Sequence, residues 1–263
     1  MKAIIPVLVL LLAACTTTPT GRSQLMFISD GELNQLGVNS FDQLKSSGKL
    51  VRDSRRLGYA RCIVDALVRE LPSEWRGIAW EVQLFEDPTA NAFALPGGKV
   101  GVNTGMLALA ADQNQLAAVL GHEIGHVVFR HSGERVSQDL AARTGLSVAG
   151  AITQSRASPE TARAVSALLG AGAQVGVLLP FSRKHESEAD VYGQELMARA
   201  GFDPAAAVAL WQAMQRNAGA RPIEWLSTHP DPENRVRRLS ERVAELTVVQ
   251  RQARAAGRVP DCR

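Results

Sequence analysis

Residues 112–128 constrain the fold most, because they combine a core-facing helix with polar groups that need partners. Apolar side chains recur there at helical spacing, and Asp112 is a suitable N-cap. His122 and His126 are four residues apart, so both project from one face of that helix, and Glu123 follows the first. Two imidazoles at this spacing can hold one Zn²⁺, and the neighbouring carboxylate can take a proton from a water on that metal. The pattern predicts a hydrolytic metal site on a packed helix.

A catalytic zinc site needs three protein ligands and one open position, so a third ligand must come from elsewhere in the chain. A histidine six residues after the second ligand would be one solution, but Ser132 occupies that position and Phe129 replaces the accompanying glycine. His131 is five residues after His126, outside the reach of the same helical face. We therefore expect His131 to be a structural or a surface histidine.

A second candidate helix at residues 182–190 supplies the missing groups. Glu186 and Asp190 are four residues apart and share one face, so Glu186 is predicted to be the third ligand. Asp190 is predicted to accept the free N–H of a ligand histidine, His122, and to fix its tautomer. Thermolysin-like enzymes use the same order of Glu and Asp. Glu188 lies between the two, and we expect it to belong to a solvated acidic face.

Two glycines, Gly121 and Gly125, interrupt the helix that carries the histidines. Each glycine lowers helix stability by about 1 kcal/mol relative to alanine. We therefore expect another backbone to approach the helix closely at these positions, next to the metal ligands.

Three short strands are predicted before the histidine helix. Residues 78–86 alternate apolar and polar side chains, and residues 91–95 and 99–102 flank the turn at residues 96–98 (Pro-Gly-Gly). Together with the helices, these strands predict an α+β chain that is mostly helical and contains a small β-sheet.

Further helices are predicted on both sides of this region. Residues 50–71 have helical spacing, and Asp203-Pro204 and Asp231-Pro232 each provide a cap followed by proline at the first helical position. The last of these helices carries three arginines that we expect to be solvated: Arg235, Arg237 and Arg238.

Residues 137–180 are rich in alanine and glycine, which predicts a helical region with breaks. Its most apolar part, residues 165–180, is shorter than the roughly 20 residues that a membrane span needs. We expect it to be a buried or groove-lining helix.

The N-terminus has the pattern of an exported chain, because a short apolar run ends in Leu12-Ala13-Ala14-Cys15. This sequence resembles the lipobox of bacterial lipoproteins. The resemblance implies that residues 1–14 are a signal peptide and that Cys15 carries lipid; an ordinary signal peptide followed by cysteine is the alternative. Thr16, in place of Asp, implies the outer membrane, and residues 15–30 are then the lipidated cysteine and a tether.

Cys62 and Cys262 remain as a candidate disulfide in an oxidising compartment, with two unpaired thiols as the alternative. The bridge would attach the C-terminal tail, residues 246–263, to the body of the protein. The net charge of +3 is spread along the chain without a basic block, so no nucleic-acid partner is expected.

Four motifs together resemble one family of zinc metalloproteases, which includes HtpX, the CAAX prenyl proteases and the periplasmic lipoproteins BepA and LoiP. They occur in the family's order and extend across residues 91–235. The motifs are NAFALPGG at residues 91–98, GHEIGH at 121–126, SRKHESEAD at 182–190, and Thr228-His229-Pro230 followed by Arg235.

The resemblance implies a zincin-type protease domain at residues 31–245, with one Zn²⁺ held by His122, His126 and Glu186 and with Glu123 as general base. It favours the lipoprotein branch of the family, without the helical-repeat region of BepA. The implied activity is endoproteolysis of misfolded or assembling envelope proteins.

Two further roles are implied by the resemblance alone. His229 resembles a residue at the rim of the active site, where it either donates to the oxyanion or acts as a fourth zinc ligand that keeps the enzyme latent; capping of the proline-rich turn is the third alternative. The strand at the edge of the cleft would bind extended substrate backbone through Asn91, Ala92, Phe93 and Ala94.

The expected partners are unfolded or extended polypeptides, the membrane through the N-terminal lipid, and envelope assembly proteins. The expected location is the periplasmic face of the outer membrane. A chaperone-like or binding lipoprotein with a latent, four-liganded zinc is the main alternative, and a zinc amidase acting on cell-wall peptides is a weaker one.

Overall fold

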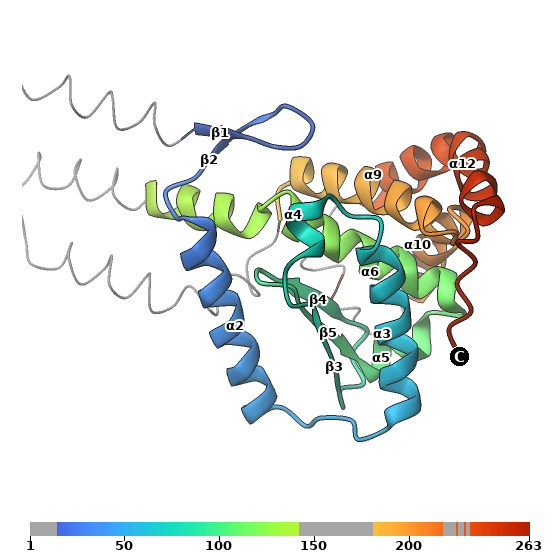
Figure 1. Ribbon diagram of the computed structural model, residues 1–263, viewed down its shortest axis with the longest axis horizontal. Helices are drawn as coiled ribbons and strands as arrows, with labels where there is room; N and C mark the ends of the chain where they lie inside the picture. Colours follow the sequence, from blue (N-terminus) through green and yellow to red (C-terminus); the bar gives the residue numbers. More distant parts are fainter. Residues whose placement is uncertain (1–14, 142–180, 218–224, 226–228, 230–231) are drawn as a thin grey trace, which may run out of the picture.

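The computed structural model describes residues 15–141, 181–217, 225, 229 and 232–263 (Figure 1). The expected signal peptide and the apolar stretch at residues 165–180 lie outside these residues. Among the helices that are described, none is both long and apolar enough to cross a membrane.

The described chain is mostly helical with two small sheets, which confirms the predicted α+β class. The labelled helices are α2 (Asp30–Ser47), α3 (Ser54–Val68), α4 (Ser73–Arg76), α5 (Thr104–Leu109), α6 (Gln113–Val128), α9 (Arg183–Arg199), α10 (Ala205–Asn217) and α12 (Pro232–Ala255), and residues 131–141 are also helical. The strands are β1 (Cys15–Thr17), β2 (Ser23–Leu25), β3 (Glu81–Phe85), β4 (Ala92–Leu95) and β5 (Lys99–Asn103).

The larger described sheet has the strand order β3-β5-β4, so β4 lies at an edge. β3 pairs with β5 in parallel, whereas β4 pairs with β5 in antiparallel register through a tight turn. Gly97 and Gly98 in that turn have φ values of +81° and +73°, a left-handed conformation that favours glycine. β3 begins later than predicted: the backbone N–H of Trp80 donates to the carbonyl of Ile78 at 3.0 Å instead of to a neighbouring strand, and its indole N–H donates to the carbonyl of Trp75 at 2.8 Å.

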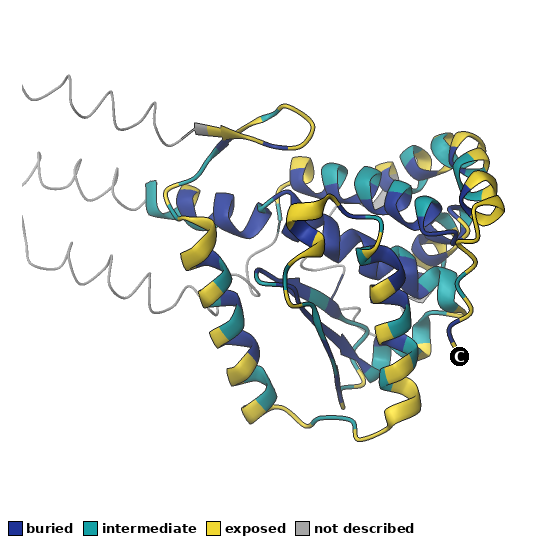
Figure 2. Cartoon of the chain, viewed as in Figure 1, coloured by how far each residue is buried: buried dark blue, intermediate teal, exposed yellow. Residues whose placement is uncertain are grey.

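Helix α6 runs through the middle of the protein and contacts β4, α3, α9 and α10 (Figures 1 and 2). Asp112 caps it as predicted, accepting from the backbone N–H groups of Asn114 and Gln115 at 2.9 Å each. Every residue from Gly121 to Val128 is buried. The histidine helix is therefore packed on several sides, so its polar side chains must find partners inside the protein.

Close packing of α6 against α9 explains the two predicted glycines. A Cβ added at Gly121 would lie 3.0 Å from the carbonyl oxygen of Gly193, and one at Gly125 would lie 3.2 Å from the Cα of Ala189. Conversely, a Cβ on Gly193 would lie 2.7 Å from the backbone nitrogen of His122. The expected approach of a second backbone is present, and α9 provides it.

Both ends of the described chain dock on this core. At the N-terminus, where a tether was expected, β1 and β2 pair as an antiparallel hairpin. At the C-terminus, α12 continues past residue 245 to Ala255, and a disulfide joins Cys262 to Cys62 of α3. Gln113, the first residue of α6, accepts from the N–H of Cys262 at 2.9 Å and donates to the carbonyl of Pro260 at 3.1 Å.

Candidate metal centre

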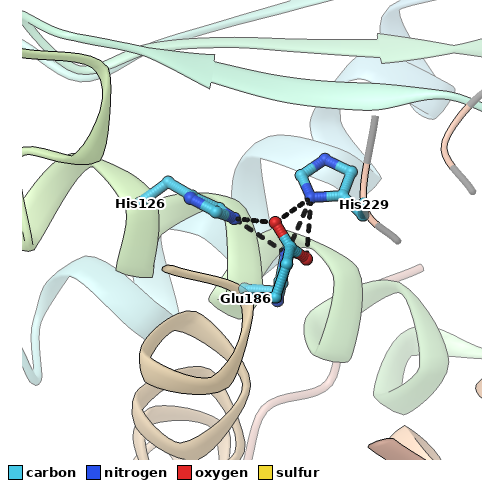
Figure 3. A group of neighbouring side chains, drawn as sticks. His126, Glu186 and His229 are labelled. Atoms are coloured by element: carbon cyan, nitrogen blue, oxygen red, sulfur yellow. Dashed lines mark hydrogen bonds and ion pairs between the residues drawn. The ribbon is translucent and has the colours of Figure 1, made fainter. Parts of the chain in front are cut away.

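Four buried side chains from three parts of the chain point toward one another. His122 and His126 come from α6, Glu186 comes from the first turn of α9, and His229 precedes α12. Figure 3 shows His126, Glu186 and His229. One ligand atom from each lies within 4.8 Å of the ligand atoms of the others. The Nε2 atoms of His122 and His126 are 2.9 Å apart, and His229 Nδ1 is 3.1 Å from Glu186 Oε1. The structure thus brings together the three predicted ligands and His229.

The donor set fits a zinc ion. His122 Nδ1 lies 3.0 Å from Asp190 Oδ1, and the pKa of Asp190 is about 2, because Arg235 and His122 outweigh the effect of burial. Asp190 is therefore an ionised acceptor, so His122 Nδ1 donates and its Nε2 presents a lone pair to the cluster. Imidazole nitrogens combined with one carboxylate are the ligands of many catalytic zinc sites.

The electrostatics of the cluster also suit a cation. Burial lowers the pKa of His126 and of His229 well below the ordinary value, so both rings are neutral, which is the form that coordinates metal. Burial raises the pKa of Glu186 to about 7. A bound cation would favour its charged form.

Arg235 is a site residue, although it was predicted to be solvated. It is fully buried, its Nη1 donates to Glu186 Oε2 at 2.7 Å, and its Nη2 donates to Asp190. The guanidinium also stacks on Trp211, 3.7 Å from the ring centroid. The expectation of a solvated residue was wrong, because α12 packs on α9 and this face of α12 meets the two carboxylates.

The other two arginines that were expected to be solvated differ from Arg235. Arg237 is exposed, as expected, and pairs with Glu241 one turn along. Arg238 is partly buried, with its side chain 28% exposed and Nη2 3.6 Å from Asp190 Oδ2. The expectation of solvation therefore holds fully only for Arg237.

Glu123 is buried beside the ligand cluster. The indole N–H of Trp225 donates to its Oε1 at 2.7 Å, and His229 Nε2 is 3.4 Å from the same oxygen. Burial raises its pKa, although the backbone of Ala94 and the Trp225 indole also hydrogen-bond the carboxylate and act in the opposite direction. A raised pKa makes this carboxylate a stronger base than an ordinary glutamate. Trp225 was not predicted from the sequence as a site residue.

The predicted substrate strand lies next to this carboxylate. Ala92, Phe93 and Ala94 belong to the edge strand β4, while Asn91 precedes it and accepts from the N–H of Asn103 at 3.0 Å. β4 contacts α6, and the backbone of Ala94 hydrogen-bonds the Glu123 carboxylate. The edge strand therefore borders the ligand cluster.

His131 and Glu188 are both more involved than expected. His131 is fully buried, which excludes the surface alternative, and its Nδ1 is 2.9 Å from His126 Nδ1. Glu188, expected to be solvated, instead lies 3.0 Å from His131 Nε2 and accepts hydrogen bonds from Arg22. The prediction for Glu188 was wrong because the N-terminal hairpin covers this face of α9.

Comparison with known proteins then gives the family. The model of peptidase family M48 matches residues 54–243. The chain belongs to peptidase family M48. The matched part contains His122, His126, Glu123, Glu186 and His229.

Relatives of this M48 chain occur in bacteria and in mitochondria. It is 40% identical to the mitochondrial metalloendopeptidase OMA1 of Schizosaccharomyces pombe over 173 residues, which is 65% of this chain and 49% of the relative. It is 31% identical to the beta-barrel assembly-enhancing protease of Escherichia coli over 230 residues, 85% of this chain and 46% of the relative. It is 32% identical to OMA1 of Danio rerio over 241 residues, which is 86% of this chain and 49% of the relative. The matched region thus spans about half the length of these relatives.

Proposed function

We propose that this M48 member is a zinc-dependent endopeptidase in which His122, His126 and Glu186 hold the metal and Glu123 is the general base. One observation carries the proposal. A buried carboxylate that no ligand role requires lies directly beside a complete ligand cluster and against an edge strand. A structural zinc site needs no such base.

A bound zinc ion would lower the pKa of a water toward about 7 and polarise the substrate carbonyl. Glu123 would be the group that accepts a proton from the attacking water and returns it to the leaving amine, and its raised pKa favours the protonated form needed for the second role. Asp190 keeps the proton of His122 on Nδ1, so that Nε2 can coordinate a metal. Arg235 holds Glu186 and Asp190 in place.

Extended polypeptides are the substrates that the edge strand fits best. The edge of β4 that has no partner among the described strands offers backbone N–H and C=O groups, apart from the Ala94 backbone group that hydrogen-bonds Glu123. A peptide can therefore add to β4 irrespective of most of its side chains. Binding there would bring the peptide backbone close to Glu123. Unfolded or assembling proteins expose such segments, whereas folded domains do not.

The second candidate is a chaperone-like or binding protein with a latent, four-liganded zinc. The position of His229 favours it, because Nδ1 lies among the ligand atoms, 3.2 Å from His122 Nε2. In that position His229 fits a fourth ligand better than an oxyanion donor. The backbone N–H of His229 also donates to the carbonyl of Trp225 at 2.9 Å, and this contact is compatible with either role.

We infer further that the protein acts at the periplasmic face of the outer membrane, anchored by lipid on Cys15. The lipobox-like sequence and the Escherichia coli relative, whose name refers to β-barrel assembly, support this location. The relatives named OMA1 are mitochondrial, so they support the peptidase activity but not the location.

Substitution of the general base tests the first proposal. Glu123→Gln should lower cleavage of unfolded casein by roughly 10²–10⁴-fold, because it removes proton transfer while keeping the shape of the side chain. Its zinc content, measured by mass spectrometry, should not change. Glu195→Gln on the partly exposed face of α9 is the matched control and should cleave like the wild type. Undiminished cleavage by Glu123→Gln would refute the peptidase proposal.

Substitution of His229 separates the two candidates. If His229 is a latent fourth ligand, His229→Phe should open the metal position and raise cleavage. If it donates to the oxyanion, the same change should lower cleavage by about 10²-fold or more. The initial rate on unfolded casein at saturating zinc distinguishes the two results by sign.

A further inference from the structure

We propose that His131 is a positioning residue for the ligand His126, and that Arg22 and Glu188 fix its orientation from the N-terminal hairpin. The inference rests on the proposed zinc site and extends it to residues outside the ligand cluster. It also gives a segment of the chain that precedes the matched part of the family a role in metal binding.

A continuous series of hydrogen bonds connects the hairpin with the ligand. Arg22 Nε and Nη2 each donate to one oxygen of Glu188 at 2.9 Å. Glu188 Oε2 is 3.0 Å from His131 Nε2, and His131 Nδ1 is 2.9 Å from His126 Nδ1. Each contact is within normal hydrogen-bond distance.

The chemistry of these groups determines which atoms carry the protons. Because Arg22 donates to both oxygens of Glu188, this carboxylate is an acceptor and His131 Nε2 must donate to it. The neutral ring of His131 then has a lone pair on Nδ1, so His126 Nδ1 must donate. His126 Nε2 is consequently unprotonated, and it faces the ligand cluster 2.9 Å from His122 Nε2.

Packing prevents the His131 ring from turning away. The ring is buried and stacks on His185, with ring centroids 4.3 Å apart and an interplanar angle of 20°. His185 is held in turn by Glu134, whose Oε2 lies 3.1 Å from His185 Nε2. Arg22 also donates to both oxygens of Glu134 at 2.7 Å. The same guanidinium therefore binds Glu188, which contacts His131, and Glu134, which contacts His185.

The two ligand histidines are therefore oriented by different means. Asp190, on α9, contacts His122 directly, whereas His126 is oriented through a second imidazole. Groups that fix a ligand's tautomer in this way typically change metal affinity 10–100-fold when they are removed. We expect His131 to have an effect of that size, and Arg22 a smaller one because it acts through two intermediates.

Zinc affinity measured by competition with a chromophoric chelator tests the inference on the full chain. His131→Phe keeps a ring but removes the acceptor, and should bind zinc 10–100-fold more weakly than the wild type. His131→Asn retains an acceptor near His126 and should recover most of the affinity. Arg22→Gln should weaken binding a few-fold. The matched control is Arg130→Gln, which breaks an ion pair to Asp30 in α2 and should bind zinc normally.

Nitrogen-15 NMR of the metal-free protein gives a second readout, since the chain has five histidines. His126 should carry its proton on Nδ1 in the wild type and lose this preference in His131→Phe. If His131→Phe does not fold, the zinc affinity of Arg22→Gln still tests the inference, because Arg22 is partly exposed and its substitution should leave the protein folded.

Three results would contradict the inference: wild-type zinc affinity in His131→Phe, wild-type affinity in Arg22→Gln, or a proton on Nε2 of His126 in the wild type. A wild-type protein that binds no zinc would refute the proposed function together with this inference. Equal affinity of the wild type and His131→Phe would refute this inference alone.

Discussion

Arg235 is a buried cation between two buried carboxylates, so its removal should destabilise the protein strongly. Arg235→Met keeps an unbranched side chain along the first part of the arginine stem, but removes the guanidinium and with it the charge, the hydrogen bonds and the stacking on Trp211. Glu186 and Asp190 would then be buried without their cation. In the absence of zinc, the free energy of unfolding at pH 7 should fall by about 3–5 kcal/mol.

The geometry supports a loss of this size. Returning the pKa of Asp190 from about 2 to its ordinary 3.8 corresponds to about 2.5 kcal/mol, and Arg235 is the largest of the influences that lower it. Loss of the 2.7 Å bond to Glu186 adds to this value. Zinc should reduce the difference, because a divalent cation also pairs with the Glu186 carboxylate.

The sign of the pH dependence follows from the same groups. Without Arg235, the guanidinium no longer offsets burial, so the pKa of Asp190 rises and that of Glu186, already above its ordinary value, rises further. A buried carboxyl group with a raised pKa is neutral at low pH and then does not destabilise the folded protein. It lowers the free energy of unfolding as the pH rises and the group ionises. The loss caused by Arg235→Met should therefore be smaller at pH 5 than at pH 7.

Urea unfolding followed by tryptophan fluorescence, with a chelator present, measures these differences. Arg237→Met is the matched control on the same helix, because Arg237 and its partner Glu241 are both more than half exposed. It should change stability by no more than about 0.5 kcal/mol. A loss below about 1 kcal/mol for Arg235→Met at pH 7, or a larger loss at pH 5, would refute the reasoning.

Three other predictions concern packing, the disulfide and acid. Gly193→Ala should lower both zinc affinity and stability, the latter by about 1–3 kcal/mol in urea unfolding, because its Cβ would lie 2.7 Å from the backbone of α6. Gly58→Ala, with open space around it, is the control and should raise the free energy of unfolding by about 0.5–1 kcal/mol. Equal changes in stability for the two variants would contradict the role of close packing at Gly193. Reducing the disulfide, which closes a separation of 200 residues, should lower the free energy of unfolding by up to about 5 kcal/mol; a loss under about 1 kcal/mol would exclude the loop-entropy explanation. Hydrogen bonds from His131 and Arg22 outweigh burial and hold the pKa of Glu188 near 2, below its ordinary 4.5, so this stabilisation is complete above pH 4.5 and is lost as the pH falls through 2. Near-UV circular dichroism should show Arg22→Gln unfolding at a higher pH than the wild type, and identical acid midpoints would count against the role of this pair.

The sequence predicts the parts of the site that depend on local geometry. His122 with His126, and Glu186 with Asp190, are each four residues apart, and helical periodicity alone places each pair on one face. The cap at Asp112 and the turn before β5 were predicted for the same reason, since their chemistry is local.

Contacts between distant elements could not be predicted in this way. Arg235 and Arg237 occupy equally charged surroundings in the sequence, and only the packing of α12 on α9 distinguishes them. Arg22 was assigned to a tether because its neighbours are polar and turn-forming.

The position of His131 could not be predicted because the helical geometry of α6 does not extend to it. The helix ends at Val128, and Arg130 has a φ of +53°, which redirects the chain. His131 therefore meets the far edge of the His126 ring instead of continuing along the helix face.

The bridge between α3 and the C-terminal tail makes the intervening chain a closed ring. His122, His126, Glu186 and His229 all lie inside it. A single peptide-bond cleavage anywhere between Cys62 and Cys262 would leave both fragments covalently joined. A nicked molecule could retain its whole ligand set as a two-chain species, which would separate into two bands only on a reducing gel.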